Sequence, residues 1–213
     1  MELSIAFEHL ARVDGSASFG FGRWHSRGQI FSQYDTGQHA QATASVSGPI
    51  EVRIVAEQPS KATIEVAVRP ISGVAATDSK AFAATILSCI LPCCILTQNP
   101  RTLIQLVVQA RIVCNKDTLL ASMINASTLA LVNAGSVPMR GVVCAVSVGK
   151  KKDGYVVDET EDTCGCFAFM FTEGSSSCVW ASWRGEDLIS AREFANSQAY
   201  QVWHRIKENT AQH

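Results

Sequence analysis

The residues that open one helix, 116–119, occupy a position suited to anion chemistry. They follow the apolar run Leu103–Val113, which predicts a buried strand, and they begin an apolar, small-residue segment that continues to Gly135. The first amides of a helix lack partners within the helix and can bind phosphate. Asp117 opposes such binding because it adds a negative charge beside these amides. Lys116 is a candidate cation for the phosphate, although at this offset we expect its side chain to point into solvent.

A group of carboxylates farther along the chain could also do chemistry. It consists of Asp158, Glu159, Glu161 and Asp162. Paired carboxylates can bind a metal ion or transfer a proton. The same residues fit a solvated acidic turn, which is the interpretation that we favour.

Cysteine and histidine are too scattered to predict a metal site. Cys164-x-Cys166 and the adjacent Cys93-Cys94 lack a second pair at zinc-ligand spacing, and the five histidines are dispersed. The N-terminus has no apolar segment of secretory length, which argues against an oxidising compartment. We therefore expect buried, reduced thiols in the cell interior, no metal and no cofactor.

The composition limits the classes of function. The chain has 213 residues, of which 47% are hydrophobic and 17% are charged, so it can bury a sizeable core. Its net charge of −1 argues against a dedicated nucleic-acid-binding domain, and the scarcity of charge favours an exterior partly covered by a partner. Residues 86–96 are shorter than the ~20 apolar residues of a membrane span, and Pro92 interrupts them, so we expect a buried helix and no membrane.

Short strand-like runs fill the first third of the chain. They are Gly15–Phe19, Gln29–Gln33, Gln41–Ser47, Glu51–Glu57 and Ala62–Arg69. Turns at Gly48-Pro49 and at residues 58–61 make 51–69 a predicted hairpin, in which Ile54 and Ile64 supply apolar faces. Residues 20–34 are rich in glycine and aromatic residues and predict an inserted loop or hairpin.

Helices and strands alternate in the rest of the chain. One helix is predicted to reach about Leu91, and a second ends at Gly135, where we expect the left-handed conformation. Their candidate N-caps are Asp78 or Ser79 for the first and Asp117 or Thr118 for the second. Later strands are expected at residues 141–148, 155–157, 167–172 and 178–183. The final helix, 186–207, carries Leu188, Ala191, Ala195, Ala199, Val202 and Ile206 at helical spacing. No linker divides the chain, so we predict a single domain over residues 1–213.

Several blocks of sequence together resemble the RNase PH superfamily. In chain order they are Asp14-Gly15-Ser16-Ala17, Val46–Val52, Pro100–Gln105 with Gln109, the helix Leu119–Gly135, and Val137-Pro138-Met139-Arg140. Each block is a modest signal, but the ordered set covers most of the chain as far as about residue 158. Within the superfamily, the Thr-Leu-Leu-Ala opening of the helix is most similar to a ring subunit of the eukaryotic RNA exosome.

The resemblance implies an α+β / α/β fold, with mixed β-sheets and packed helices in one RNase PH-like domain. It implies other RNase PH-like exosome ring subunits and RNA-binding cap subunits as partners. RNA would be threaded through the assembly towards a separate nuclease. The implied locations are the nucleus and nucleolus, and also the cytoplasm.

The resemblance also identifies chemical groups that this chain lacks. Active relatives cleave RNA with inorganic phosphate, which the helix opening Gly-Gly-Thr/Ser-Arg holds. The matching residues here are Lys116-Asp117-Thr118-Leu119, so Leu119 stands at the arginine position. An expected aspartate falls near Cys164-Gly165, and residues 74–78 lack the arginines that grip RNA in active relatives. We therefore expect a degenerate phosphate site and no catalytic residues.

Three cations lie near positions where the superfamily faces RNA or its dimer mate, namely Arg53, Lys61 and Arg69. We predict that they bind RNA, and a solvated or ion-paired strand edge is the alternative. A second candidate RNA contact, by stacking plus charge, consists of Arg23, Trp24, His25 and Arg27. A partner-facing or disordered insertion is the alternative for this cluster.

The sequence therefore favours a non-catalytic RNase PH-like ring subunit of the RNA exosome, which helps to form the channel that delivers RNA for 3′-to-5′ processing and decay, including rRNA processing. One alternative is an active phosphate-dependent 3′-to-5′ exoribonuclease with a displaced site that uses Lys116 and Asp158 or Asp162. The other is a free-standing homodimeric nuclease.

Overall fold

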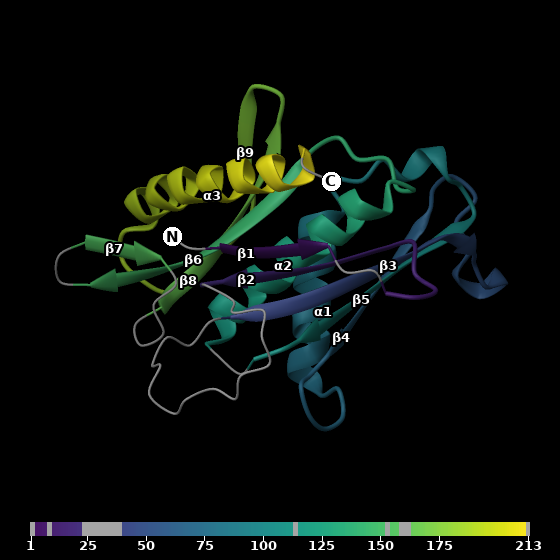
Figure 1. The fold of residues 1–213 in the computed structure, drawn as a ribbon, viewed down its shortest axis with the longest axis horizontal. Helices are drawn as coiled ribbons and strands as arrows, with labels where there is room; N and C mark the ends of the chain where they lie inside the picture. Colours follow the sequence, from purple (N-terminus) through teal and green to yellow (C-terminus); the bar gives the residue numbers. More distant parts are fainter. Residues whose placement is uncertain are drawn as a thin grey trace.

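The computed structural model describes residues 3–7, 10–22, 40–112, 115–151, 154–157 and 163–211. Over these residues the chain forms two β-sheets with helices between and outside them (Figure 1). This arrangement agrees with the mixed sheets and packed helices predicted from the sequence.

The first sheet has five strands in the order β1-β2-β3-β5-β4. Their bounds are Leu3–Phe7 (β1), Gly15–Phe21 (β2), Gln41–Glu51 (β3), Thr63–Arg69 (β4) and Thr102–Ala110 (β5). Neighbouring strands are antiparallel except β4 and β5, which are parallel with Thr63 opposite Leu103 and Arg69 opposite Gln109. A parallel pair requires a crossover connection, and helix α1 (Thr77–Ile90) supplies it.

The second sheet has four antiparallel strands in the order β7-β6-β8-β9. Their bounds are Val142–Lys151 (β6), Gly154–Val157 (β7), Thr163–Thr172 (β8) and Ser175–Trp183 (β9). Helix α2 (Lys116–Ala134) packs against strands of both sheets, and helix α3 (Leu188–Ala211) packs on β6 and β8 (Figure 1). Two short 3-10 turns, η1 (Ile54–Ala56) and η2 (Leu96–Gln98), complete the elements of the described chain.

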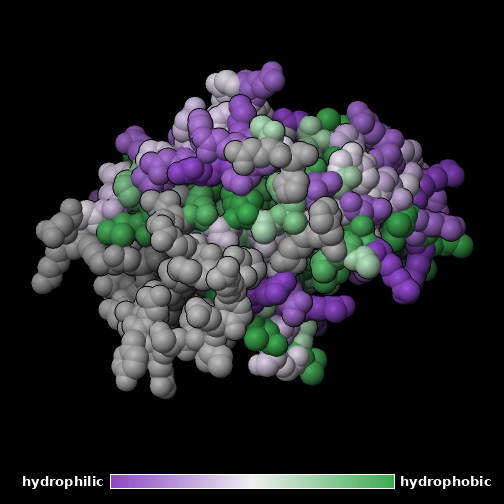
Figure 2. All heavy atoms as spheres, viewed as in Figure 1, coloured by the Kyte–Doolittle hydropathy of each residue, from purple (hydrophilic) through white to green (hydrophobic). Residues whose placement is uncertain are grey.

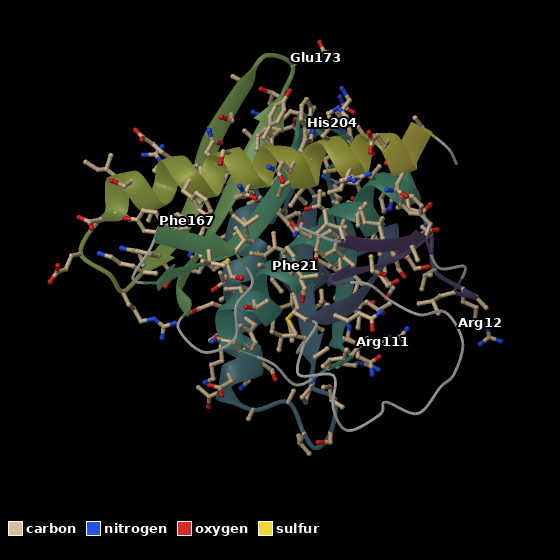
Figure 3. All side chains as sticks on the ribbon, turned by 60° about the vertical axis from the view of Figure 1, so that its left-hand side comes forward. Arg12, Phe21, Arg111, Phe167, Glu173 and His204 are labelled. Atoms are coloured by element: carbon tan, nitrogen blue, oxygen red, sulfur yellow. The ribbon has the colours of Figure 1, made fainter. Side chains whose placement is uncertain are left out.

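The core forms on both sides of α2, whose residues from Leu120 to Leu131 are all buried. Phe21 from the first sheet and Phe167 from the second have no exposed surface, and both point into the interior (Figure 3). Gly15 in β2 allows the helix to approach closely, because a Cβ atom there would lie 2.4 Å from the Ala134 nitrogen. The helix is therefore held tightly between two sheets.

The predicted hairpin over residues 51–69 is wrong. β5 lies between β3 and β4, so these two strands do not pair with each other. Gly48 and Pro49 produce an irregularity inside β3, where the register shifts between Ser47 and Ile50, and do not form a turn between two strands. The expected strand around Ile54 is replaced by η1, because no sheet face is available to bury its side chains.

Both predicted helix caps are also wrong. The N-cap of α2 is Asn115, whose Oδ1 atom accepts a hydrogen bond from the Asp117 amide at 3.2 Å. The N-cap of α1 is Ala76, which makes no side-chain cap bond. The predicted end of α2 is confirmed, since Gly135 has φ 62 and closes the helix. Sequence patterns gave no signal for β1, a five-residue strand whose side chains are all half-buried.

The buried stripe of α3 is confirmed except at its start. Leu188 was expected in this stripe, but it is 48% exposed at the first turn, whereas the later members are buried. β5 is also less covered than expected, because Ile104, Leu106 and Val108 are buried while Gln109 on the opposite face is exposed. The predicted strand 29–33 lies outside the described residues.

Among the described residues on the face that Figure 2 shows, polar side chains gather over α3 and patches of apolar side chains lie below it. Residues 86–96 include the end of α1 at Ile90, two residues before Pro92, as the sequence predicts, but this part of the helix is only partly buried, since Ser88 and the C-cap Leu91 are exposed. Within the described ranges, no helix combines the length and the apolar character needed to cross a membrane.

Candidate functional site: the first turn of α2

The N-terminus of α2 carries an internal ion pair. The Asp117 side chain is only 11% exposed, and its Oδ2 atom accepts a hydrogen bond from the Arg184 guanidinium. Arg184 follows β9 directly and remains 65% exposed, so it reaches the helix from the second sheet. The first turn of the helix therefore carries a nearly buried negative charge, and Arg184 balances it.

Arg184 is a residue that sequence reasoning missed. It lies 67 residues from Asp117, and the only local signal was an arginine next to the end of a predicted strand. Gly185 follows it, and a Cβ atom at that glycine would meet the Trp183 ring at 2.7 Å. The close packing of Trp183 and Gly185 thus fixes the backbone beside Arg184.

Lys116 points into solvent, as the sequence predicts. Its Nζ atom lies 3.1 Å from Oδ2 of Asp78, and both side chains are more than 70% exposed. The pair joins the first turns of α1 and α2. Exposed ion pairs of this kind stabilise a protein by less than about 1 kcal/mol, so the contact is a weak link.

Thr118 and Leu119, the other two residues of the degenerate phosphate site, face the protein. Thr118 is fully buried, and its hydroxyl donates to Oγ of Ser147 in β6 at 3.1 Å. Leu119 is half-buried against the core. Thr118 is therefore not available to a ligand at the start of the helix, and Leu119 offers it no polar group.

The described residues at this turn can therefore do little with phosphate. An incoming anion would meet the Asp117 carboxylate, and binding would require Arg184 to give up its partner. The helix dipole favours a negative charge here, and Asp117 already supplies that charge. The first turn therefore holds a carboxylate that is paired with an arginine of the same chain, and Asn115 Oδ1 accepts a bond from the Asp117 amide.

The three predicted RNA-binding cations are all exposed, but they do not form one group. Arg69 lies at the C-terminal end of β4, opposite Gln109. Lys61 precedes the N-terminal end of the same strand, whose seven residues span roughly 20 Å. Arg53 follows β3 at the same end as Lys61. Their binding of RNA stays a prediction.

Each end of this sheet has a further arginine that the sequence did not single out. Arg111 follows β5 near Arg69, and its Nε atom donates to the buried Thr43 hydroxyl at 2.8 Å (Figure 3). Arg101 precedes β5 between Arg53 and Lys61, since Glu51 pairs with Thr102 and Thr63 pairs with Leu103. Cations therefore gather at both ends of the sheet.

The sequence blocks that suggested a family hold the fold together. The Asp14 carboxylate accepts a hydrogen bond from the Gly48 amide at 2.7 Å, and the Ser136 hydroxyl donates to the Gly48 carbonyl at 2.6 Å. Ile95 and Pro138 share a backbone bond of 2.8 Å, as do Arg140 and Cys93. These motif residues join separate segments, so their role is structural.

The cysteines whose side chains the structure describes agree with the prediction of buried thiols, except Cys178, which is half-buried. Burial raises the pKa of Cys89 to about 12 and also raises the pKa of Cys144 and Cys166. Cys93 and Cys94 place their sulfur atoms 3.8 Å apart in the interior. No group of three potential metal ligands was found in the part of the chain that the structure describes.

Two candidate groups lie outside the described residues. They are the acidic run with Asp158, Glu159, Glu161 and Asp162, and the cluster with Arg23, Trp24, His25 and Arg27. Their roles stay predictions.

Comparison with known proteins decides the family. Residues 2–136 match the model of the RNase PH 3′ exoribonuclease family, domain 1. This chain belongs to the RNase PH family. The match covers the first sheet and α2, and it includes every block noted in the sequence except the last, Val137–Arg140.

The relatives by sequence are exosome proteins. The chain is 38% identical over 122 residues to the exosome complex component rrp46 of Schizosaccharomyces pombe, covering 57% of this chain and 53% of the relative. It is 34% identical over 117 residues to the exosome complex exonuclease RRP46 homolog of Oryza sativa, covering 55% and 48%. The matched region is thus about half the length of each of these relatives.

Solved structures share the fold. Rice Rrp46 has a TM-score of 0.74 at 23% identity, covering 97% of this chain and 91% of the rice chain. The Archaeoglobus fulgidus exosome, solved with RNA bound to the active site, has a TM-score of 0.65 at 15% identity, covering 96% and 87%. The RNase PH fold therefore extends over nearly the whole chain.

Proposed function

We propose that this chain is a non-catalytic RNase PH-like ring subunit of an RNA exosome. Its partners are other RNase PH-like subunits and RNA-binding cap subunits, and RNA passes through the assembly for 3′-to-5′ processing and decay. Processing of rRNA and a location in the nucleus, nucleolus and cytoplasm belong to the same proposal. The names of the matched relatives support the assembly.

The observation that carries the non-catalytic assignment is the ion pair between Asp117 and Arg184. Phosphorolysis brings an anionic attacker to an anionic substrate, so it requires fixed donors and cations that are free to bind both. At the first turn of α2 the Asp117 carboxylate adds a negative charge and engages Arg184, and Leu119 supplies no charge. The electrostatics oppose the approach of phosphate.

One experiment tests both parts of the proposal. The chain is purified with a tag from its own cells, and the mass of the native assembly is measured. Labelled RNA, phosphate and magnesium are then added to the isolated chain, and the products are separated. We expect a multi-subunit assembly and no release of nucleoside diphosphates by the chain alone.

One observation favours the alternative of an active phosphate-dependent exoribonuclease. Arg184 is a largely exposed cation at the position where phosphate would need one. If Arg184 could exchange Asp117 for phosphate, the chain would release nucleoside diphosphates, and Arg184→Ala would abolish that release while Lys116→Ala would not. This outcome would replace the non-catalytic assignment.

A further inference from the structure

Two adjacent cysteines lie side by side in the turn that follows α1. The Sγ atoms of Cys93 and Cys94 are 3.8 Å apart. In an extended chain neighbouring side chains point to opposite faces. Here the amides of both cysteines donate to the Ile90 carbonyl, at 3.0 and 3.3 Å, and the resulting turn places the two sulfur atoms on one side. We refer to Cys93 and Cys94 as the adjacent thiol pair.

The two thiols differ in their surroundings. Cys93 has no exposed surface, and its sulfur lies 2.9 Å from the Ile90 carbonyl oxygen, whereas Cys94 keeps 4% of its surface exposed. When Cys94 ionises, the Cys93 thiol can turn its hydrogen toward the Cys94 sulfur, and this hydrogen bond lowers the pKa of Cys94 and raises that of Cys93. A thiolate reacts with oxidants faster than a thiol does. Cys94 is therefore the residue that reacts first, and Cys93 is the thiol placed to resolve the product.

The peptide group between the two cysteines is tied to the fold on both sides. The Cys93 carbonyl accepts a hydrogen bond from the Arg140 amide at 2.8 Å, and the Cys94 amide donates to Ile90. Adjacent Cα atoms are about 3.8 Å apart, which is closer than the roughly 4.4 Å at which usual disulfides begin. A disulfide within the pair would therefore have to turn this peptide group, and the two backbone bonds would be lost.

The turn after α1 is joined to the segment that leads into β6. Cys94 and Met139 form an isolated antiparallel bridge, and the Ile95 amide donates to the Pro138 carbonyl at 2.8 Å. The bond from Arg140 to Cys93 belongs to the same contact. Turning the peptide group of the pair would thus release one anchor of residues 137–140, directly before the second sheet begins.

We propose that the adjacent thiol pair is an oxidative modification site, which a peroxide converts to a disulfide. The Cys94 thiolate attacks one oxygen of hydrogen peroxide, the O–O bond breaks, and sulfenic acid and hydroxide form. The Cys93 sulfur then attacks the Cys94 sulfur, and its proton leaves with the hydroxyl group as water. In total, two thiols and one hydrogen peroxide give one disulfide and two waters. A thiol reductant reverses the change, because strained disulfides are readily reduced. The inference does not depend on the proposed function.

Mass spectrometry of the full chain tests the modification. The chain is purified with a reductant, transferred to hydrogen peroxide, alkylated and digested with trypsin, which releases residues 81–101 with Cys89, Cys93 and Cys94. We expect this peptide to lack two hydrogens and to carry one alkyl group, on Cys89. A disulfide to any other cysteine, or a peptide with all three cysteines alkylated, would overturn the proposal.

Two serine variants test the separate roles of the thiols. Cys93→Ser removes the resolving thiol, so peroxide should leave a sulfenic acid at Cys94 that dimedone labels. Cys89→Ser is the matched control, because Cys89 is a buried thiol of the preceding helix and its loss should leave the disulfide unchanged. Equal dimedone labelling of Cys94 in the native chain and in Cys93→Ser contradicts resolution by Cys93.

Hydrogen exchange measured by NMR tests the structural consequence. After oxidation the Arg140 amide should exchange roughly tenfold faster, because its acceptor has turned away, and dithiothreitol should restore the slow rate. The Ala145 amide is the internal control, since it donates to Asn125 Oδ1 and should not change. Equal exchange at Arg140 before and after disulfide formation would show that the pair closes without releasing residues 137–140, and that part of the proposal would fail.

Discussion

The side-chain amide of Asn125 forms two hydrogen bonds with the backbone of Ala145. Its Nδ2 atom donates to the Ala145 carbonyl at 2.8 Å, and its Oδ1 atom accepts from the Ala145 amide at 2.7 Å. β7 pairs with β6 only between Val148 and Lys151, so Ala145 lies beyond the end of that strand. The asparagine of α2 takes the place of the missing strand and joins the helix to the second sheet.

Replacing Asn125 with Leu should destabilise the protein strongly. Two buried backbone groups of Ala145 would lose their partners, and the loss should be about 3 kcal/mol. Urea unfolding followed by circular dichroism measures it. The control is Ser127→Ala, because the Ser127 hydroxyl donates to the Met123 carbonyl within the same helix, and that carbonyl keeps its helical environment. Equal losses in the two variants would contradict the strand-like role of Asn125.

Replacing Gly15 with Ala should push α2 away from β2. The new Cβ atom would lie 2.4 Å from the Ala134 nitrogen and 2.5 Å from the Ala130 oxygen, and both are backbone atoms that cannot rotate away. We expect a loss of about 3 kcal/mol in the free energy of unfolding. Gly20→Ala in the same strand is the control, since its nearest contact would be 3.2 Å and its loss should be smaller. Urea unfolding of both variants checks this prediction, and Gly15→Ala should have the lower midpoint.

Removing Arg184 and removing Asp117 should lower the free energy of unfolding by different amounts. Arg184→Ala leaves the nearly buried Asp117 carboxylate without its guanidinium, and we expect a loss of about 1–2 kcal/mol. Asp117→Asn leaves Arg184, which is 65% exposed and can be solvated, so the loss should be smaller. Thermal unfolding of both variants measures the difference. A larger loss in Asp117→Asn would mean that the arginine is the group that needs its partner.

The same pair explains which parts of the site the sequence could predict. The helix start and Leu119 were visible locally, because an apolar strand precedes a run of small and apolar residues. Arg184 was not, since its contact with Asp117 depends on how the second sheet packs against α2. Asn115 was also missed, because Asp117 and Thr118 are equally good cap residues by type and only the backbone path selects among them.

In the fold, too, features set by neighbouring residues were predicted correctly, whereas the pairing of distant strands was not. The end of α2 at Gly135 and the buried stripe of α3 follow from local patterns along one helix, and both are confirmed apart from Leu188. The hairpin over 51–69 failed because turn residues indicate that a chain reverses, but they do not specify which strand becomes the neighbour. β5 entered between β3 and β4, and the parallel pairing set by α1 left Ile54 exposed. The pairing of strands that are distant in the sequence thus decided that Ile54 and Val55 are exposed.

Stability should fall in alkaline solution because of buried thiols. Burial raises the pKa of Cys89 from 9.0 to about 12. Between these values the unfolded chain releases the thiol proton while the folded chain retains it, so stability decreases as pH rises, by up to about 1.4 kcal/mol per pH unit for one thiol. Below pH 9 this contribution is fully present.

Urea unfolding at pH 8 and pH 10 compares the native chain with Cys89→Ala. The variant should lose less stability between the two pH values, by about 1 kcal/mol, whatever its stability at pH 8. Cys178→Ala is the control, because that thiol is only half-buried and its removal should change the alkaline loss less. If Cys89→Ala and the native chain lose equal stability, the Cys89 thiol ionises as readily in the folded protein as in the unfolded one.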